Sequence, residues 1–143
     1  MFPDDNLLFS SLRSLVKKMH RLGDREMAPY GMGHGELRLL LLLYGNDGCG
    51  QDYLISRLTV DRTNVGRALA KLEKMGLVRR IRSLDDGRAN VVFLSDRGRE
   101  MQEPLLAAKE RIERKVTGAL SDDEIDLLSR LLFKMDEGLS DGS

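Results

Sequence analysis

Apolar residues recur at steps of three and four along much of the chain, and this period predicts amphipathic helices. The first predicted helix spans residues 5–28 and ends at Pro29, which cannot continue it. The second spans His34 to Tyr44, with Gly33 at its N-cap position, and its leucines are too dense for a single face. We therefore expect the second helix to be buried on most sides.

The middle of the chain predicts two short helices followed by a β-hairpin. Gln51–Leu58 forms the first of these helices, after a glycine-rich turn at residues 45–50. Asp61 caps the second, which runs to Met75 and stops at Gly76, a position that suits the left-handed conformation. Two strands joined by a polar turn follow, Leu77 to Arg82 and Val91 to Ser95.

The C-terminal part of the chain predicts two further helices. Ser95 caps a helix that continues to about Thr117, and Pro104 should kink it, because a proline beyond the first turn removes a backbone hydrogen bond. Ser121 and Glu124 form a capping box for the last helix. The apolar face of that helix carries Ile125, Leu128, Leu131, Leu132 and Met135. The predicted fold class is therefore mainly α with a small β-hairpin.

Length and composition indicate a single soluble domain, with or without helical extensions. At 143 residues the chain can bury roughly 68–70% of its unfolded surface, so it needs no disulfide or metal to fold. The single cysteine, Cys49, cannot form an internal bridge, which is typical of a reducing cytoplasm. The N-terminus lacks the features of a signal peptide. The longest apolar run, Leu39 to Tyr44, is far shorter than the about 20 residues that span a membrane. We expect a cytoplasmic protein with no membrane partner.

The distribution of charge matters more than its total. The chain carries 23 basic and 23 acidic residues, and a net charge of zero argues against a nucleic-acid partner. Residues 51–99, however, carry 11 Lys and Arg against 6 Asp and Glu, a net charge of +5. Residues 100–143 carry 6 against 11, a net charge of −5. This segregation indicates a cationic side that attracts a polyanion, the alternative being a solvated surface whose charges happen to segregate.

The helix after Asp61 combines a core-facing side with a polar side that suits base reading. Arginine bonds two acceptors of guanine, asparagine pairs with adenine, and threonine meets the methyl group of thymine. Small residues such as Gly66 and Ala70 let the backbone approach the groove floor. The side predicted to pack inward consists of Val65, Ala68, Leu69, Leu72 and Met75. The predicted DNA contacts are Arg62, Thr63, Asn64, Arg67, Lys71 and Lys74. An ordinary surface helix with scattered positive charge is the alternative.

The predicted hairpin favours the DNA interpretation. Arg80 and Arg82 lead into its turn and Arg88 leaves it. Asp86, two places before Arg88, can brace that guanidinium and hold it extended. A braced arginine at a hairpin tip can enter a narrow minor groove, where the potential is most negative. The alternative is a structural turn whose charged edges discourage sheet aggregation.

Three motifs in this order resemble the core of the MarR (multiple antibiotic resistance regulator) family. They are Asp61 to Val65, Leu72 to Val78, and Asp86 to Ala89 with Leu94–Ser95. The resemblance extends over residues 1–143, because the flanking helices match the family's order of elements. It implies a winged helix-turn-helix DNA-binding core at residues 34–95, with the hairpin as the wing. It also implies dimerisation helices at residues 5–28 and 96–138.

The resemblance to this family implies a homodimer that binds double-stranded DNA. The terminal helices of two subunits would interleave, which gives their apolar stripes a partner, although an independent monomeric helical core is an alternative. Two-fold symmetry would then require a pseudo-palindromic operator with half-sites roughly 34 Å apart.

The resemblance also implies a repressor that is relieved by a small aromatic or phenolic ligand. The implied pocket lies between the dimer base and the DNA-reading part, near Met27, Tyr30, His34 and Leu37. Plain core packing of these four residues is the alternative, and the glycines around them depart from the family pattern.

Other functions find less support in the sequence. A winged-helix module that binds an acidic protein is one alternative. A redox-responsive regulator that uses Cys49 is another, although the relatives that sense oxidants do so through a cysteine near the start of the first helix, where this chain has none. His20 and His34 lack a metal-binding spacing, so we expect no metal and no cofactor. We expect no enzyme, because the sequence has no phosphate loop and no nucleophile–base pair.

Overall fold

The computed structural model describes residues 7–58, 62–82 and 90–139. It is mainly helical with one small antiparallel sheet, which confirms the predicted fold class. In chain order the elements are α1 (Leu7–Met27), the 3-10 helix η2 (Ala28–Tyr30), α2 (His34–Gly45), β1 (Cys49–Gly50), α3 (Gln51–Leu58), α4 (Arg62–Lys74), β2 (Val78–Arg82), β3 (Asn90–Leu94), α5 (Asp96–Glu100), α6 (Gln102–Thr117) and α7 (Asp122–Leu139).

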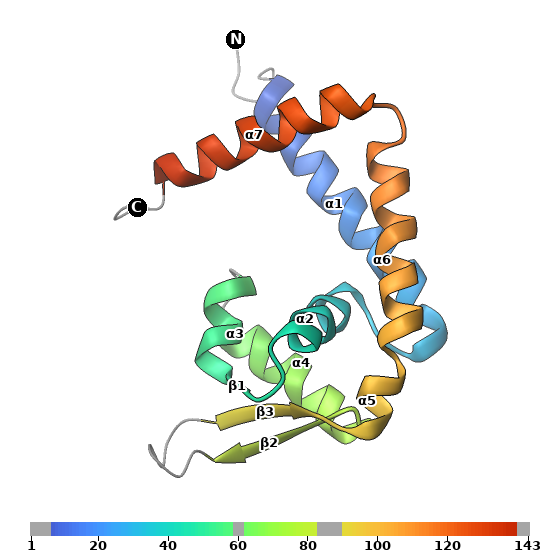
Figure 1. Cartoon of the computed structure of the whole chain (residues 1–143), viewed down its shortest axis with the longest axis vertical. Helices are drawn as coiled ribbons and strands as arrows, with labels where there is room; N and C mark the ends of the chain where they lie inside the picture. The colour runs from blue at the N-terminus through green and yellow to red at the C-terminus, as the bar shows by residue number, and fades with distance from the viewer. Residues whose placement is uncertain (1–6, 59–61, 83–89, 140–143) are drawn as a thin grey trace.

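The elements form two parts, which we call the lobe and the stem. The lobe contains α2, α3, α4 and the three strands, and the stem contains α1, α6 and α7 (Figure 1). α1 and α6 pack against each other and against α2, so they connect the stem to the lobe. Glu26 of α1 accepts two hydrogen bonds from Arg111 of α6, at 2.6 and 2.9 Å. α7 follows α6 after a sharp turn at the far end of the stem (Figure 1).

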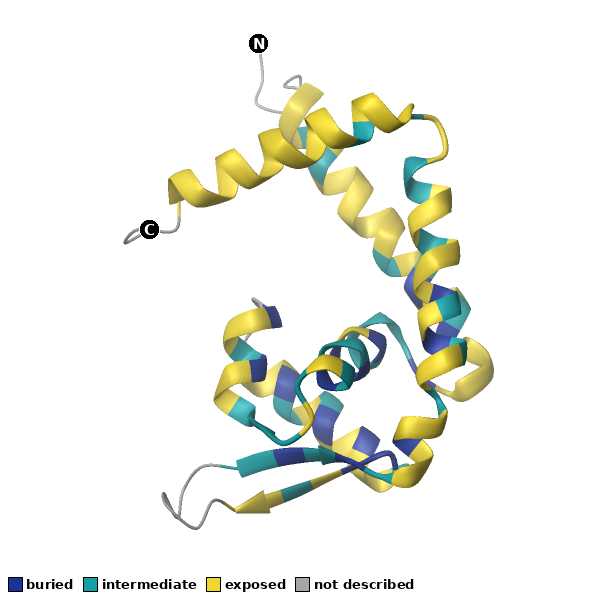
Figure 2. Ribbon diagram, viewed as in Figure 1, coloured by how far each residue is buried: buried dark blue, intermediate teal, exposed yellow. Residues whose placement is uncertain are grey.

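The hydrophobic core lies in the lobe and at the junction with the stem (Figure 2). α1 contributes Met27 near its C-terminal end, and α6 contributes Leu105. No residue of α7 is buried among the residues that the structure describes. The largest fully buried side chains are Met27, Leu39, Leu40, Leu43, Leu54, Leu69, Leu72, Leu77, Leu105, Val65, Val78 and Val92. Helix α2 supplies three of these leucines, in agreement with the prediction that it is buried on most sides.

The sheet has three strands in the order β1-β3-β2, where the sequence predicted two. β2 and β3 pair in antiparallel register from Val78 opposite Leu94 to Arg82 opposite Asn90. β1 was predicted as part of a turn, and that prediction is wrong at Cys49–Gly50. These two residues pair with Val92 and Val91 of β3. The pairing partner lies some forty residues away, so no local pattern indicates this strand.

Local capping signals are confirmed where the structure describes them. The backbone N–H of Gly33 donates to Glu36 Oε1 at 3.0 Å, at the start of α2. Gly76 adopts φ = 76°, the left-handed conformation that stops the preceding helix. Ser95 Oγ accepts a hydrogen bond from Gly98 N at 3.0 Å at the start of α5. The predicted capping box of α7 is present, with Ser121 and Glu124 bonded reciprocally at 2.9 and 3.2 Å. The predicted cap at Asp61 lies outside the described residues.

The predicted helix from Ser95 to Thr117 is two helices, with the break at Met101. The sequence predicted a kink caused by Pro104. A proline ring clashes with the carbonyl four residues earlier, here that of Glu100, so one helix cannot run through. The chain instead ends α5 at Glu100 and starts α6 at Gln102, which places Pro104 in the first turn of α6, where it is tolerated. The predicted continuous, kinked helix is therefore wrong: the chain has a break at Met101, three residues before Pro104.

Candidate nucleic-acid interface

Helix α4 presents a polar ridge on the surface of the lobe. Val65, Leu69 and Leu72 face inward and are fully buried, as predicted. The opposite side carries Thr63, Arg67, Ala70 and Lys74, which are all exposed and one turn apart; we call these four residues the reading ridge. Arg67 and Lys74 have no carboxylate partner among the described residues. Within the described part of the chain, no carboxylate neutralises these two charges.

Of three further predicted DNA contacts on α4, Lys71 and Arg62 have ion-pair partners within the lobe, and Asn64 lines a hollow. Lys71 Nζ lies 2.8 Å from Glu36 Oε1 at the start of α2. Asn64 is exposed and lines a hollow between α4 and α2. Arg62 Nη1 lies 2.7 Å from Asp52 Oδ1 of α3, and both side chains are more than 70% exposed. A surface ion pair of this kind contributes little to stability, so a phosphate can readily displace Asp52.

The wing begins with an ion pair that connects it to α4. Arg80 of β2 donates to Glu73 Oε1 from Nη2 at 2.9 Å and from Nε at 3.2 Å. Two donors on one carboxylate oxygen fix the direction of the guanidinium. Arg80 was predicted as a DNA contact, and the structure places it at the base of the wing. Arg82, at the end of β2, is exposed. Arg88 and Asp86 lie outside the described residues, so their predicted bracing stays a prediction.

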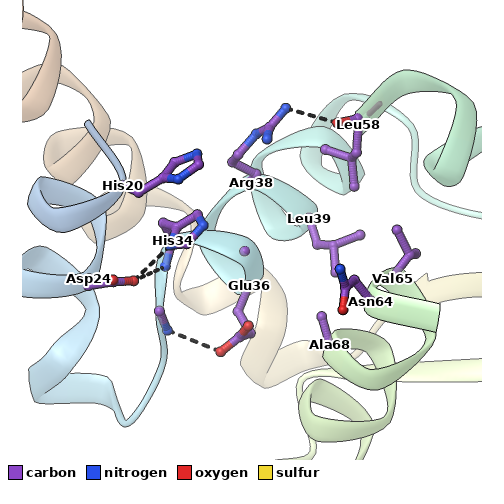
Figure 3. A pocket seen from close by; sticks show the side chains of 12 residues that line it. His20, Asp24, His34, Glu36, Arg38, Leu39, Leu58, Asn64, Val65 and Ala68 are labelled. Carbon is purple, nitrogen blue, oxygen red and sulfur yellow. Dashed lines mark hydrogen bonds and ion pairs between the residues drawn. The ribbon is translucent and has the colours of Figure 1, made fainter. Parts of the chain in front are cut away.

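A hollow of about 430 Å³ separates α4 from α1 (Figure 3). His20 and Asp24 of α1 line one side, α2 lines the floor, and Val65 and Ala68 of α4 line the other side. A second, more apolar hollow of about 380 Å³ lies between α1, α2 and α6. Both hollows share His20, His34 and Arg38.

The four residues of the predicted ligand pocket are not brought together. His34 lines both hollows and Leu37 lines the second. Met27 is fully buried in the core, and Tyr30 is exposed on η2; neither lines either of these two hollows.

His34 is held by α1 through two hydrogen bonds (Figure 3). Asp24 Oδ1 accepts from the backbone N–H of His34 at 2.8 Å and lies 2.9 Å from His34 Nδ1. These hydrogen bonds hold the pKa of Asp24 below its usual value. The His20 ring stacks on the His34 ring, with the centroids 4.0 Å apart. Burial lowers the pKa of His20, and the electrostatic effects of the neighbouring His34 and Arg38 lower it further.

Cys49 does not have the surroundings of a reactive thiol. It is half-buried in β1 and packs against the core. Burial, together with the Asp47 carboxylate, raises the pKa of its thiol, which disfavours the reactive thiolate. This environment argues against a redox sensor based on Cys49. The described residues contain no cluster of three or more His, Cys, Asp and Glu arranged to bind a metal ion. None of the described helices combines the length and the apolar character needed to cross a membrane.

Comparison with known proteins identifies the family. The sequence profile of the MarR family matches residues 33–89. The chain is 35% identical over 114 residues to the HTH-type transcriptional regulator YdgJ of Bacillus subtilis, covering 80% of this chain and 70% of that protein. The chain belongs to the MarR family. It is a DNA-binding transcription regulator and not an enzyme.

Solved structures agree with this assignment. A probable transcriptional regulator from Pseudomonas aeruginosa is 30% identical with a TM-score of 0.82, covering 92% of this chain and 98% of that one. A MarR mutant from E. coli, complexed with operator DNA, shares the fold with a TM-score of 0.84 at 23% identity, covering 94% of this chain and 97% of that one. The winged helix-turn-helix architecture predicted from the MarR motifs is thereby confirmed.

The sequence did not predict the partners that organise this MarR-family site. Glu36, Glu73 and Asp52 each bind a cation that was predicted to bind DNA. His20 and Arg38 were not assigned to a pocket, although both line the two hollows. Only one signal was available in the sequence: His20 and Asp24 lie one turn apart on the same face of the first helix. Their meeting with His34 depends on how two helices cross.

Proposed function

We propose that this chain is a dimeric, sequence-specific repressor that reads its operator with the ridge of α4. The observation that carries the proposal is the exposure of Thr63, Arg67, Ala70 and Lys74 along one side of a helix whose other side is core. Arg67 is suited to a bidentate contact with guanine, and Thr63 to the methyl group of thymine. Ala70 keeps the ridge low between them. Lys74 at the end of the helix, and Arg82 on the wing, are suited to phosphate contacts.

The apolar surface of the stem supports a dimer of identical chains. α1 and α7 expose large apolar side chains along most of their length. A continuous apolar surface of this kind on a protein marks an interaction site. Burial removes about 25 cal/mol per Å² of apolar surface, so a contact that covers both helices has a large driving force. These exposed residues are Leu7, Leu8, Phe9, Leu15, Val16, Met19, Leu127, Leu128, Leu131, Leu132, Phe133, Met135 and Leu139.

A dimer of this kind places two reading ridges on one side of a duplex. Two-fold symmetry then favours a pseudo-palindromic operator with half-sites about 34 Å apart. The MarR structure from E. coli with operator DNA supports this mode of binding. A protein that covers two successive major grooves excludes other proteins from them. We therefore propose repression by occupation of the promoter.

The hollows at the junction support control by a small aromatic ligand. The stacked rings of His20 and His34 offer a flat surface, and Arg38 offers a cation that suits a carboxylate or a phenolate. Because the hollows lie between the stem and the lobe, a ligand there would change the spacing of the two reading ridges. We propose that a phenolic acid releases the operator in this way.

Selection of bound duplexes from a random pool tests the base-reading role. The wild-type protein should enrich one pseudo-palindromic sequence. Arg67→Ala should reduce affinity for that sequence by about 1–3 kcal/mol and relax the preference at one base pair of each half-site. Arg67→Lys is the matched control, because it keeps the charge and removes the bidentate geometry. If both variants select the same sequence as the wild type, Arg67 does not read bases.

Light scattering of the purified protein tests the dimer. Leu131→Asp on α7 should give monomers that no longer bind the selected duplex tightly. Lys134→Gln on the same helix changes the net charge by the same amount and should leave the dimer intact. The ligand is tested by fluorescence polarisation of the operator complex with a panel of phenolic acids. Release by one of them, and its absence in Arg38→Gln, would support the hollow as the site; failure of the whole panel to release the operator would contradict it.

A further inference from the structure

Glu36 connects two parts of the lobe that the sequence places 35 residues apart. Its Oε1 atom accepts a hydrogen bond from the backbone N–H of Gly33 at 3.0 Å and lies 2.8 Å from Lys71 Nζ. The Glu36 side chain is only 13% exposed, whereas Lys71 is 47% exposed. The hydrogen bond from Gly33 thus orients the Glu36 carboxylate independently of Lys71. Lys71 is therefore held by a rigid partner.

The position of Lys71 on α4 differs from that of the reading ridge. Lys71 follows Asn64 and Ala68 along the flank that faces α2, and those two residues line the hollow beside Glu36. Thr63, Arg67 and Lys74 follow the neighbouring, outward side. The buried Val65, Leu69 and Leu72 anchor α4 in the core, and an ion pair on the flank adds a constraint on the rotation of the helix about its own axis, which decides where Arg67 points.

A comparison with Arg62 shows why Lys71 is unsuited to a phosphate. Asp52, the partner of Arg62, is 72% exposed, so water solvates it when a phosphate takes the arginine. Glu36 has lost most of its hydration, and removing Lys71 would leave a half-buried carboxylate with one backbone donor. Leaving a poorly hydrated charge without its partner is unfavourable.

A second contact from α2 reaches the other helix of the helix-turn-helix pair. Arg38 Nη2 donates to the backbone oxygen of Leu58, the last residue of α3, at 3.3 Å. Glu36 and Arg38 thus connect one turn of α2 to the last turn of α4 and to the end of α3. Figure 3 shows the hydrogen bonds of Glu36 with Gly33 and of Arg38 with Leu58.

We propose that Glu36 and Lys71 are a positioning pair that sets the orientation of the reading ridge, and that Lys71 contacts no DNA phosphate. The inference rests on the proposed function, because it assigns these residues a role in operator recognition. A lysine that positions the ridge contributes to the preference for the operator. A lysine that binds phosphate contributes equally to every sequence and to the salt dependence of binding.

The test measures binding of Glu36→Gln, Lys71→Gln and the double variant to the selected duplex and to a random duplex of equal length, at several salt concentrations. Glutamine at position 36 still accepts from Gly33 N, so the start of α2 is preserved. Lys74→Gln is the matched control, since Lys74 lies one turn further on the outward side. The fraction of active protein is determined for each variant by titration at stoichiometric concentrations, which separates misfolding from weaker binding.

We expect each single variant to bind the operator about tenfold more weakly and random DNA almost unchanged, an effect comparable to the removal of one base-specific interaction. The double variant should bind no more weakly than either single one. The slope of the logarithm of the binding constant against the logarithm of the salt concentration, which we call the salt slope, should stay unchanged in all three variants. Lys74→Gln should instead weaken both duplexes and reduce the slope by about 0.9 for each phosphate that the protein no longer neutralises.

Two results would overturn the inference while leaving the proposed function intact. One is a fall of the salt slope in Lys71→Gln like that in Lys74→Gln, with Glu36→Gln binding like the wild type. The other is wild-type preference for the operator in both single variants. If the wild type itself shows no preference between the two duplexes, the proposed function fails, and the inference fails with it.

Discussion

The replacement of Gly98 by alanine tests how closely α5 packs under the wing. Gly98 is buried, and its carbonyl accepts a hydrogen bond from Tyr44 Oη at 2.8 Å. Burial raises the pKa of Tyr44 to about 12, so the phenol stays protonated and can donate. A Cβ atom at position 98 would lie 2.2 Å from the backbone oxygen of Leu77 and 3.3 Å from Leu94 Cδ2. The nearest obstacle is backbone, which no side-chain rotation can move.

The expected decrease in stability follows from the displacement that this close approach requires. Real Cβ atoms essentially never approach closer than 3.0 Å, so the 2.2 Å separation must widen by 0.8 Å or more. Overpacking of a core by one methyl group costs about 1–3 kcal/mol. Leu77 O also accepts from Ser95 N at 3.0 Å, and a shift of Leu77 weakens that hydrogen bond by a further ~1 kcal/mol. We expect Gly98→Ala to lower the free energy of unfolding by about 3 kcal/mol.

Urea denaturation followed by circular dichroism measures this change, at one protein concentration for all variants because dimerisation affects the midpoint. A decrease of about 3 kcal/mol corresponds to a fall of roughly 10 °C in the thermal midpoint. Gly35→Ala is the control: it is also in a helix, and a Cβ there meets no atom within 4 Å. That variant should be as stable as the wild type or up to about 1 kcal/mol more stable.

An unfolding free energy of Gly98→Ala within about 0.5 kcal/mol of the wild type, the range of ordinary surface substitutions, would refute this reasoning. Such a result would mean that α5 can move away from Leu77 at no energetic cost. The connection between lobe and stem would then be looser than the hydrogen bonds of Tyr44 and Ser95 indicate.

Three further predictions concern ionisable groups. The His20 imidazole should titrate below 6.5 in NMR spectra, and the stability that its neutral form contributes should be lost as the pH falls below 6.5; a midpoint above 6.5 would contradict the effect of burial. Arg111 holds the pKa of Glu26 below its usual 4.5, so stability should fall as the pH falls below 4.5, and Glu26→Gln should show less of this decrease in acid titrations. Cys49 should react with iodoacetamide at pH 7.5 more slowly in the folded than in the unfolded chain, and equal rates would show that the thiol is not protected.

The sequence predicted most helices because their signals are local. Gly33 and Gly76 mark the start of α2 and the end of α4, and Ser95 and Ser121 cap α5 and α7 through neighbours three residues away. The same holds for the buried side of α4, which follows from the helical period alone. Pro104 indicated an interruption of the helix, but the local sequence did not show that the interruption would be a break at Met101 instead of a kink.

The parts that were missed depend on contacts between distant segments. β1 exists only because Cys49 and Gly50 meet β3. The hollows arise where α1 crosses α2. Met27 and Tyr30 line neither of them, because Met27 is buried in the core and Tyr30 lies on η2. No spacing in the sequence indicates which helix faces point at each other across a junction.

The charges that are available for DNA binding also depend on contacts between distant segments. Residues 51–99 form a cationic segment. The number of its Lys and Arg residues overstates how many cations without an ion-pair partner a duplex can contact. In the folded chain the carboxylates of Glu73 and Glu36 pair with Arg80 and Lys71, and these pairs connect the wing and α2 to α4. The two acidic partners therefore do not merely weaken a basic surface. Glu73 and Glu36 each hold one cation of this surface in an ion pair. Of the cations that were predicted to bind DNA, Arg67, Lys74 and Arg82 are exposed and have no carboxylate partner among the described residues. A net charge of zero is thus compatible with a DNA-binding protein, because the acidic residues beside the site pair with only part of its basic ones.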